Sequence, residues 1–259
     1  MGERTSYAPG TFCWVDLGLP DVDAGKAFYG AVLGWSAADM PSEGGLYSLC
    51  SVEERPVAAL YAEAEPSLGV PVWNNYVTVA DVDAAAARAA ELGATVEGEP
   101  VDVEGAGRMA VLADPEGARL SLWEARGMEG AALVNAPGAL VWNELGTRDP
   151  DAAQRFYGEL FGWTFEGEGE LDTGTEYLTI RNGEPLNGGI RRITAMEGDT
   201  PAHWLPTFGV ADLDAAVGAV GEAGGQVLFG PVDVGPGRIA VIKDPQRTPL
   251  ALYDGRFDP

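Results

Sequence analysis

Histidine and cysteine are scarce in this chain, and both scarcities restrict the chemistry it can carry. Its 259 residues include one histidine, His203, and two cysteines, Cys13 and Cys50. One imidazole cannot supply the two histidines of an iron site built from two histidines and a carboxylate. The cysteines lack the spacing of a zinc ribbon or a disulfide framework, so we expect them to be small core residues.

Positive charge and long apolar runs are also lacking. The chain has 16 Lys and Arg against 40 Asp and Glu, a formal charge of −24. Such a surface repels phosphate backbones and anionic membranes, which argues against nucleic acid as a partner. No stretch approaches the roughly 18 apolar residues of a membrane span, and the start shows no signal-peptide pattern. We therefore expect a cytoplasmic protein that meets neither nucleic acid nor membrane.

The sequence contains one signature that occurs twice. Residues 14–18 are Trp-Val-Asp-Leu-Gly and residues 28–30 are Phe-Tyr-Gly. Trp-Asn-Glu-Leu-Gly and Phe-Tyr-Gly follow at 142–146 and 156–158, each 128 residues after its first copy. A repeat of this length predicts two homologous halves.

The boundary between the halves is expected in a stretch punctuated by glycine and proline. We place an N-terminal domain at 1–126, a linker at about 127–138 and a C-terminal domain at 139–259. This tandem arrangement predicts a monomer with internal pseudo-two-fold symmetry and leaves further dimerisation open.

A second signal occurs twice in each half: an aspartate, an Asp-Ala pair two residues later, a helical stretch and a closing glycine. The four copies begin at Asp21, Asp81, Asp149 and Asp212. The first aspartate can accept bonds from the free N–H groups of a helix start, and the glycine suits the left-handed position after its end. Alternating strand patterns flank each helix. The predicted class is α+β, with two βαβββ units in each half.

Longer motifs point to a family. They are Phe28-Tyr29 with Leu33-Gly34-Trp35, Phe156-Tyr157 with Phe161-Gly162-Trp163, and the Gly-Arg to Asp-Pro stretches 107–115 and 237–245. With these motifs the chain resembles a tandem member of the vicinal oxygen chelate superfamily, the glyoxalase, bleomycin-resistance and extradiol dioxygenase group. The resemblance implies two domains, each a half-open curved sheet or cup with its helices outside.

In that family the cup usually holds a divalent metal on His, Gln or Glu ligands from the first, fourth, fifth and eighth strands. The resemblance places the first, fifth and eighth ligand positions at Trp14 and Trp142, at Asn74 and Leu205, and at Glu124 and Asp254. Only the eighth-strand carboxylates remain as ligands. We therefore predict no metal ligands and no cofactor, and leave open a weakly held divalent metal such as Mg, Mn or Ca.

Two further carboxylates lie on the first strands. Asp16 and Glu144 follow the tryptophans by two residues, so strand alternation places them on the same sheet face. They either face a ligand, where one of two neighbouring carboxyl groups keeps its proton, or form ion pairs with arginines such as Arg108 and Arg238. Both interpretations stay open.

The functional expectation is a glyoxalase or bleomycin-resistance-like protein with degenerate metal sites that binds an aromatic or amphipathic small molecule in its cup. The alternative is an enzyme of the superfamily, a lyase, isomerase or oxygenase, acting on a substrate with vicinal oxygens through carboxylates. The predicted ligand-binding residues are Trp14, Asp16, Asn74, Glu124, Trp142, Glu144, Trp204 and Asp254. The candidate catalytic residues are Glu124, Asp254 and His203.

Overall fold

Each half of the chain forms its own eight-stranded mixed sheet. The computed structural model describes residues 2–42, 45–66, 69–170 and 176–257. The first half contains β2 (Phe12–Leu19), α1 (Val22–Leu33), β3 (Ser36–Ser42), β4 (Gly45–Val52), β5 (Arg55–Ala62), β6 (Trp73–Thr78), α2 (Val82–Glu91), β7 (Thr95–Val103), β8 (Gly107–Ala113) and β9 (Arg119–Ala125). The second contains β11 (Leu140–Thr147), α3 (Pro150–Phe161), β12 (Thr164–Glu170), β13 (Glu176–Arg181), β14 (Leu186–Arg192), β15 (His203–Gly209), α4 (Leu213–Glu222), β16 (Gln226–Asp233), β17 (Gly237–Lys243) and β18 (Pro249–Gly255). The predicted α+β class and the four βαβββ units are confirmed.

The two sheets have the same strand order. The first runs β3-β4-β5-β2-β6-β9-β8-β7, and the second runs β12-β13-β14-β11-β15-β18-β17-β16. In both, the first and fifth strands of the half pair antiparallel at the centre, while the fourth and eighth run parallel beside them. A two-stranded ribbon joins β1 (Gly2–Glu3) to β10 (Leu133–Val134), so the stretch expected as a linker carries a strand.

The four predicted helix starts have the expected caps. In each, the aspartate side chain accepts a hydrogen bond from the backbone N–H three residues later, as Asp21 does from Ala24. The closing glycines adopt positive φ angles: Gly34 72°, Gly93 98°, Gly162 75° and Gly224 82°. These local signals therefore determine where each helix begins and ends.

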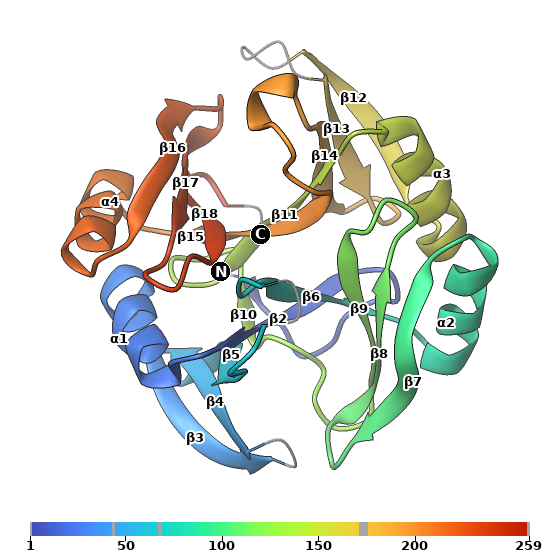
Figure 1. Ribbon diagram of the computed structural model, residues 1–259, viewed down its shortest axis with the longest axis horizontal. Helices are drawn as coiled ribbons and strands as arrows, with labels where there is room; N and C mark the ends of the chain where they lie inside the picture. Colours follow the sequence, from blue (N-terminus) through green and yellow to red (C-terminus); the bar gives the residue numbers. More distant parts are fainter. Residues whose placement is uncertain (1, 43–44, 67–68, 171–175, 258–259) are drawn as a thin grey trace.

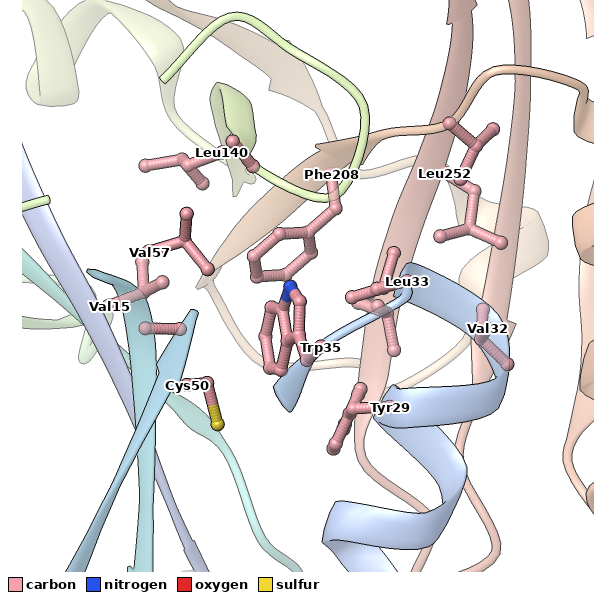
Figure 2. Close-up of a cluster of buried hydrophobic side chains, with 14 of the residues drawn as sticks. Val15, Tyr29, Val32, Leu33, Trp35, Cys50, Val57, Leu140, Phe208 and Leu252 are labelled. Carbon is pink, nitrogen blue, oxygen red and sulfur yellow. The ribbon is translucent and has the colours of Figure 1, made fainter. Parts of the chain in front are cut away.

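The hydrophobic core is shared between the halves. Helix α1 lies against α4, and α2 lies against α3, so each helix pair combines one helix from either half (Figure 1). Figure 2 shows part of the cluster of buried hydrophobic side chains beside α1. In this cluster Phe208 of the second half packs between Trp35 and Leu140. The Trp35 and Phe208 ring centroids are 5.4 Å apart. Burial of this apolar area stabilises both halves together.

The repeated family motifs serve this shared core. The Tyr29 hydroxyl donates to the buried Asp244 carboxylate at 2.9 Å, and Tyr157 donates to Asp114 at 2.8 Å. Each bond joins the Phe-Tyr motif of one half to the Asp-Pro motif of the other. The indole of Trp35 donates to the carbonyl of Gly138, at the end of the stretch expected as the linker. The signature that identifies the fold therefore binds the halves to one another.

Two further expectations concern the scarce features of the sequence. Cys13 and Cys50 are both buried, free thiols, as predicted. Among the described residues, no helix has the length and apolar character needed to cross a bilayer.

Candidate functional site

A buried carboxylate lies on the inner face of the N-terminal sheet. Asp16 of β2 is 4% exposed. Its Oδ1 accepts a hydrogen bond from Asn74 Nδ2 at 2.8 Å, and its Oδ2 accepts from the hydroxyls of Tyr47 and Tyr76, each at 2.9 Å. The indole of Trp14 donates to the Tyr47 hydroxyl at 2.9 Å. Strands β2, β4 and β6 thus bring three of the predicted ligand-binding residues together: Trp14, Asp16 and Asn74.

This carboxylate borders a cavity of about 290 Å³, close to the lower end of the size range of small-molecule sites. The cavity wall combines polar and apolar side chains from strands on both sides of the central β2–β6 pair. They are Asp16, Ser42, Leu46, Tyr47, Tyr61, Glu63, Pro66, Val70, Val72, Asn74, Tyr76, Met109, Val111 and Arg119. Tyr47 and Tyr61 are nearly parallel, with ring centroids 6.3 Å apart. This cavity wall offers a flat organic molecule aromatic faces to pack against and one buried acid.

Burial controls the protonation of the cluster. Removal from water raises the pKa of Asp16 to about 6, against the lowering effect of its three hydrogen-bond donors. The negative charge of Glu63 raises that pKa further. Burial also raises the pKa values of Tyr47 and Tyr76 well above their usual range, so both phenols are neutral donors. The site therefore holds one acid that titrates close to neutral pH.

In the second half, the carboxylate that corresponds to Asp16 is Glu144, and it has a different kind of partner. Glu144 forms an ion pair with Arg191 at 2.8 Å, and Arg191 also contacts Glu197 at 2.7 Å. Trp142 donates to Tyr177 as Trp14 does to Tyr47. Strand register places Arg191 at the position of Tyr61, since each lies opposite the glycine two residues after the carboxylate. A cation thus satisfies the second carboxylate, while hydrogen-bond donors satisfy the first.

The two interpretations of the first-strand carboxylates therefore divide between the halves. Glu144 is ion-paired, although its partner is Arg191 and not one of the arginines we named. Arg108 instead contacts Asp83, and Arg238 contacts Asp254. Within the described parts of the chain, Asp16 has no cationic partner.

The eighth-strand carboxylates lie outside the cup, contrary to expectation. Glu124 accepts a bond from the backbone N–H of Val82 at the start of α2, and Asp254 accepts from Leu213 at the start of α4. Strand alternation gives the reason, because Arg119 of β9 lines the cavity, and Glu124, five residues on, lies on the opposite face. Both carboxylates complete a helix N-terminus and form ion pairs there with arginine.

The two remaining candidate residues are Trp204 and His203. Trp204 is 5% exposed in the core between the halves, where its indole donates to Tyr157 at 3.0 Å, so it does not line a cup. His203 is the first residue of β15, opposite Gly146 of β11, and its Nδ1 donates to the Pro201 carbonyl at 2.8 Å. Burial and the charge of Arg191 lower the pKa of His203, which favours the neutral ring.

The described carboxylates of the two cups do not form a donor set that fits a divalent metal. In the first, the two Asp16 oxygens face O–H and N–H protons from three neutral donors, where a metal would need lone pairs. In the second, Glu144 faces the guanidinium of Arg191. Within residues 2–42, 45–66, 69–170 and 176–257, no three His, Cys, Asp or Glu side chains lie close enough to share an ion.

The architecture is that of tandem βαβββ proteins with one cup in each half, and comparison with known proteins gives the family. The model of the Glyoxalase/Bleomycin resistance protein/Dioxygenase superfamily matches residues 11–122 and 139–252. The chain belongs to this superfamily.

Similar proteins span nearly the whole chain. "Putative glyoxylase CFP32" of Mycobacterium tuberculosis is 39% identical over 251 residues, covering 95% of both chains. The anthracycline biosynthesis protein DauV of Streptomyces sp. (strain C5) is 36% identical over 270 residues, covering 97% of this chain and 96% of its own.

Solved structures share the fold at low sequence identity. The 2,3-dioxygenase LapB from Pseudomonas sp. KL28 has a TM-score of 0.66 at 16% identity, with 97% of this chain and 95% of LapB covered. The Mn(II)-bound glyoxalase from Novosphingobium aromaticivorans has a TM-score of 0.66 at 17% identity, with 100% and 86% covered.

Proposed function

We propose that this protein binds an aromatic small molecule in its N-terminal cup. The observation that carries the proposal is a buried carboxylate, Asp16, held by neutral donors beside an aromatic-lined cavity of about 290 Å³. Such a site gives a flat apolar ligand area to bury and a few polar groups that orient it. The degenerate metal positions belong to the same proposal, because binding of this kind needs no metal.

The names of two relatives support a fused-ring ligand. DauV and its Streptomyces peucetius counterpart DnrV, 35% identical to this chain over 269 residues, are both named as anthracycline biosynthesis proteins. Anthracyclines contain fused aromatic rings, and the aromatic wall of the N-terminal cup suits ligands of that kind. We therefore take 2-naphthol, a small fused-ring phenol, as a probe.

Filling the cavity tests the site. Val111 of β8 lines it, and register places Val241 of β17 at the matching position of the second half. We expect Val111→Trp to abolish 2-naphthol binding in equilibrium dialysis and Val241→Trp to retain it. Both variants should give wild-type circular dichroism. Binding that survives Val111→Trp would overturn the assignment of the site.

The alternative is an enzyme, and the pKa of Asp16 favours it. An acid with a pKa of about 6 next to a bound ligand can exchange a proton near neutral pH. An enzyme of this type would convert a ligand of the N-terminal cup and lose turnover in Asp16→Asn while still binding it. Chromatography of the ligand after incubation with stoichiometric protein separates the cases, since a binding protein returns it unchanged.

A further inference from the structure

The hydrogen bonds around Asp16 determine which polar atoms remain for a ligand. A carboxylate only accepts, so Asn74 must turn its amide nitrogen toward Asp16. The same nitrogen donates to the Tyr61 hydroxyl oxygen at 3.0 Å. Both N–H groups of Asn74 are thereby used, and its side-chain carbonyl oxygen accepts no bond from the described part of the chain. The Tyr61 hydroxyl accepts one bond and, within the same residues, donates none.

Within the cluster of Asp16, Asn74 and Tyr61, one donor and one acceptor therefore lie next to each other on the cavity wall. Tyr61 and Asn74 both line the cavity, on β5 and β6 at either side of β2. A ligand hydroxyl is the group that satisfies both, since it can accept from Tyr61 and donate to Asn74.

We propose that Tyr61 and Asn74 form a specificity-determining pair that selects ligands carrying a neutral aromatic hydroxyl group. This inference rests on the proposed function, because it names the class of ligand that the N-terminal cup binds. The role of Asp16 is positional: it turns the Asn74 amide so that the carbonyl oxygen is available to the ligand.

The charges around the cavity disfavour an anionic ligand. Asp16 and Glu63 both line it. Among the described lining residues the cation is Arg119, which is ion-paired with Glu97 at 2.6 Å. A phenolate or aryl carboxylate would meet uncompensated negative charge, whereas a neutral phenol would not.

The second half lacks this pair. Register places Arg191 at the position of Tyr61 and Leu205 at that of Asn74. Neither side chain offers an acceptor, so this donor and acceptor combination is missing at the matching positions of the second half.

A ligand series tests the pair. 2-Naphthol can both donate and accept, 2-methoxynaphthalene only accepts, naphthalene does neither, and 2-naphthoate is an anion. We expect dissociation constants to rise about three- to tenfold with each hydrogen bond lost, and 2-naphthoate not to bind. Equilibrium dialysis against the folded full-length chain measures all four.

Two variants assign the bonds to their residues. Tyr61→Phe should weaken 2-naphthol and 2-methoxynaphthalene equally and leave naphthalene unchanged. Asn74→Leu, which introduces the residue of the second half, should erase the difference between 2-naphthol and 2-methoxynaphthalene. Tyr253→Phe removes a hydroxyl from the second half and should leave the dissociation constants of all four ligands unchanged.

The outcomes separate this inference from the proposed function. If the uncharged ligands bind with equal affinity in wild type, or Tyr61→Phe affects naphthalene as much as 2-naphthol, the specificity pair is wrong and the binding site stands. If none of the four ligands binds to the wild-type protein, the proposed function is wrong as well.

Discussion

Among single residues, the two halves differ in the groups that bind the carboxylate of the first strand. Asp16 accepts bonds from neutral phenols and an amide, whereas Glu144 is paired with Arg191. A buried carboxylate without a counter-ion is costly, so its pKa rises to about 6 in the folded protein. Positions of this kind are common at functional sites.

The raised pKa predicts a pH dependence of stability. Because folded Asp16 binds its proton more tightly than the unfolded chain does, its contribution is complete below pH 3.8 and is lost as pH rises to about 6. Asp16→Asn should remove this loss, changing the free energy of unfolding between pH 4 and 7 by at most about 3 kcal/mol relative to wild type. Urea denaturation at each pH measures it. The exposed Asp199→Asn should follow wild type, and an unchanged Asp16→Asn profile would contradict the account.

At the scale of elements, close packing of β2 against β5 shapes the N-terminal cup. Gly18 of β2 lies opposite Tyr61 of β5, and a Cβ atom at Gly18 would stand 2.2 Å from the Glu63 carboxylate and 2.9 Å from the Tyr61 ring. Any larger residue would displace the Glu63 side chain and press on the Tyr61 ring.

We therefore expect Gly18→Ala to weaken 2-naphthol binding about tenfold, by displacing the Tyr61 hydroxyl from its place beside Asn74. Gly218→Ala on the exposed side of α4, where an added Cβ meets nothing within 4 Å, is the control. It should leave binding intact and raise stability by about 0.5–1 kcal/mol. Equal effects of the two variants on binding would argue against a role for Gly18 in positioning Tyr61.

The tyrosine bonds between the halves make a second prediction at this scale. Tyr29→Phe leaves the buried Asp244 carboxylate without one donor, and Tyr157→Phe does the same to Asp114. Each should lower the free energy of unfolding by about 1–3 kcal/mol in urea titrations. Tyr253→Phe, at a half-exposed position, should cost far less. A cost of zero at Tyr29 or Tyr157 would contradict the role we assign to the motif.

At the scale of the whole molecule, the halves are separate sheets with joint cores. Helix α1 buries its apolar face with residues of the second half, including Phe208 and Leu252, as Figure 2 shows. One half alone would expose that face to water at a cost proportional to its area.

Residues 1–126 expressed alone should therefore not form a folded monomer. Expressed together with residues 127–259 as a second chain, they should form a one-to-one complex with wild-type circular dichroism. Size-exclusion chromatography with light scattering distinguishes the species. A monomeric 1–126 fragment that unfolds cooperatively would show that the shared core is dispensable.

The sequence predicted this architecture well because its signals are local. Capping aspartates such as Asp21 and the 128-residue repeat act through short-range geometry. The site was predicted in part. Asp16 and Asn74 meet, whereas Glu124, which the resemblance placed at a ligand position, is turned toward α2 by strand alternation.

Of the remaining site residues, Tyr76 follows from local alternation and Tyr61 only from long-range pairing. Tyr76 could have been found by alternation, since it lies two residues after Asn74 on the same strand face. Tyr61 joins the cluster only because β5 pairs in parallel with β2, which no local pattern indicates. The exchange of Tyr61 for Arg191, which distinguishes the two cups, depends on the same pairing.

In our proposal only the N-terminal cup binds the ligand. Isothermal titration calorimetry of the wild-type protein with 2-naphthol tests it most directly. We expect one ligand per chain, since the N-terminal cup offers a cavity and a donor and acceptor pair, while Arg191 and Leu205 lie at the matching positions of the second half. Two equivalent sites per chain, or no heat of binding at all, would contradict it.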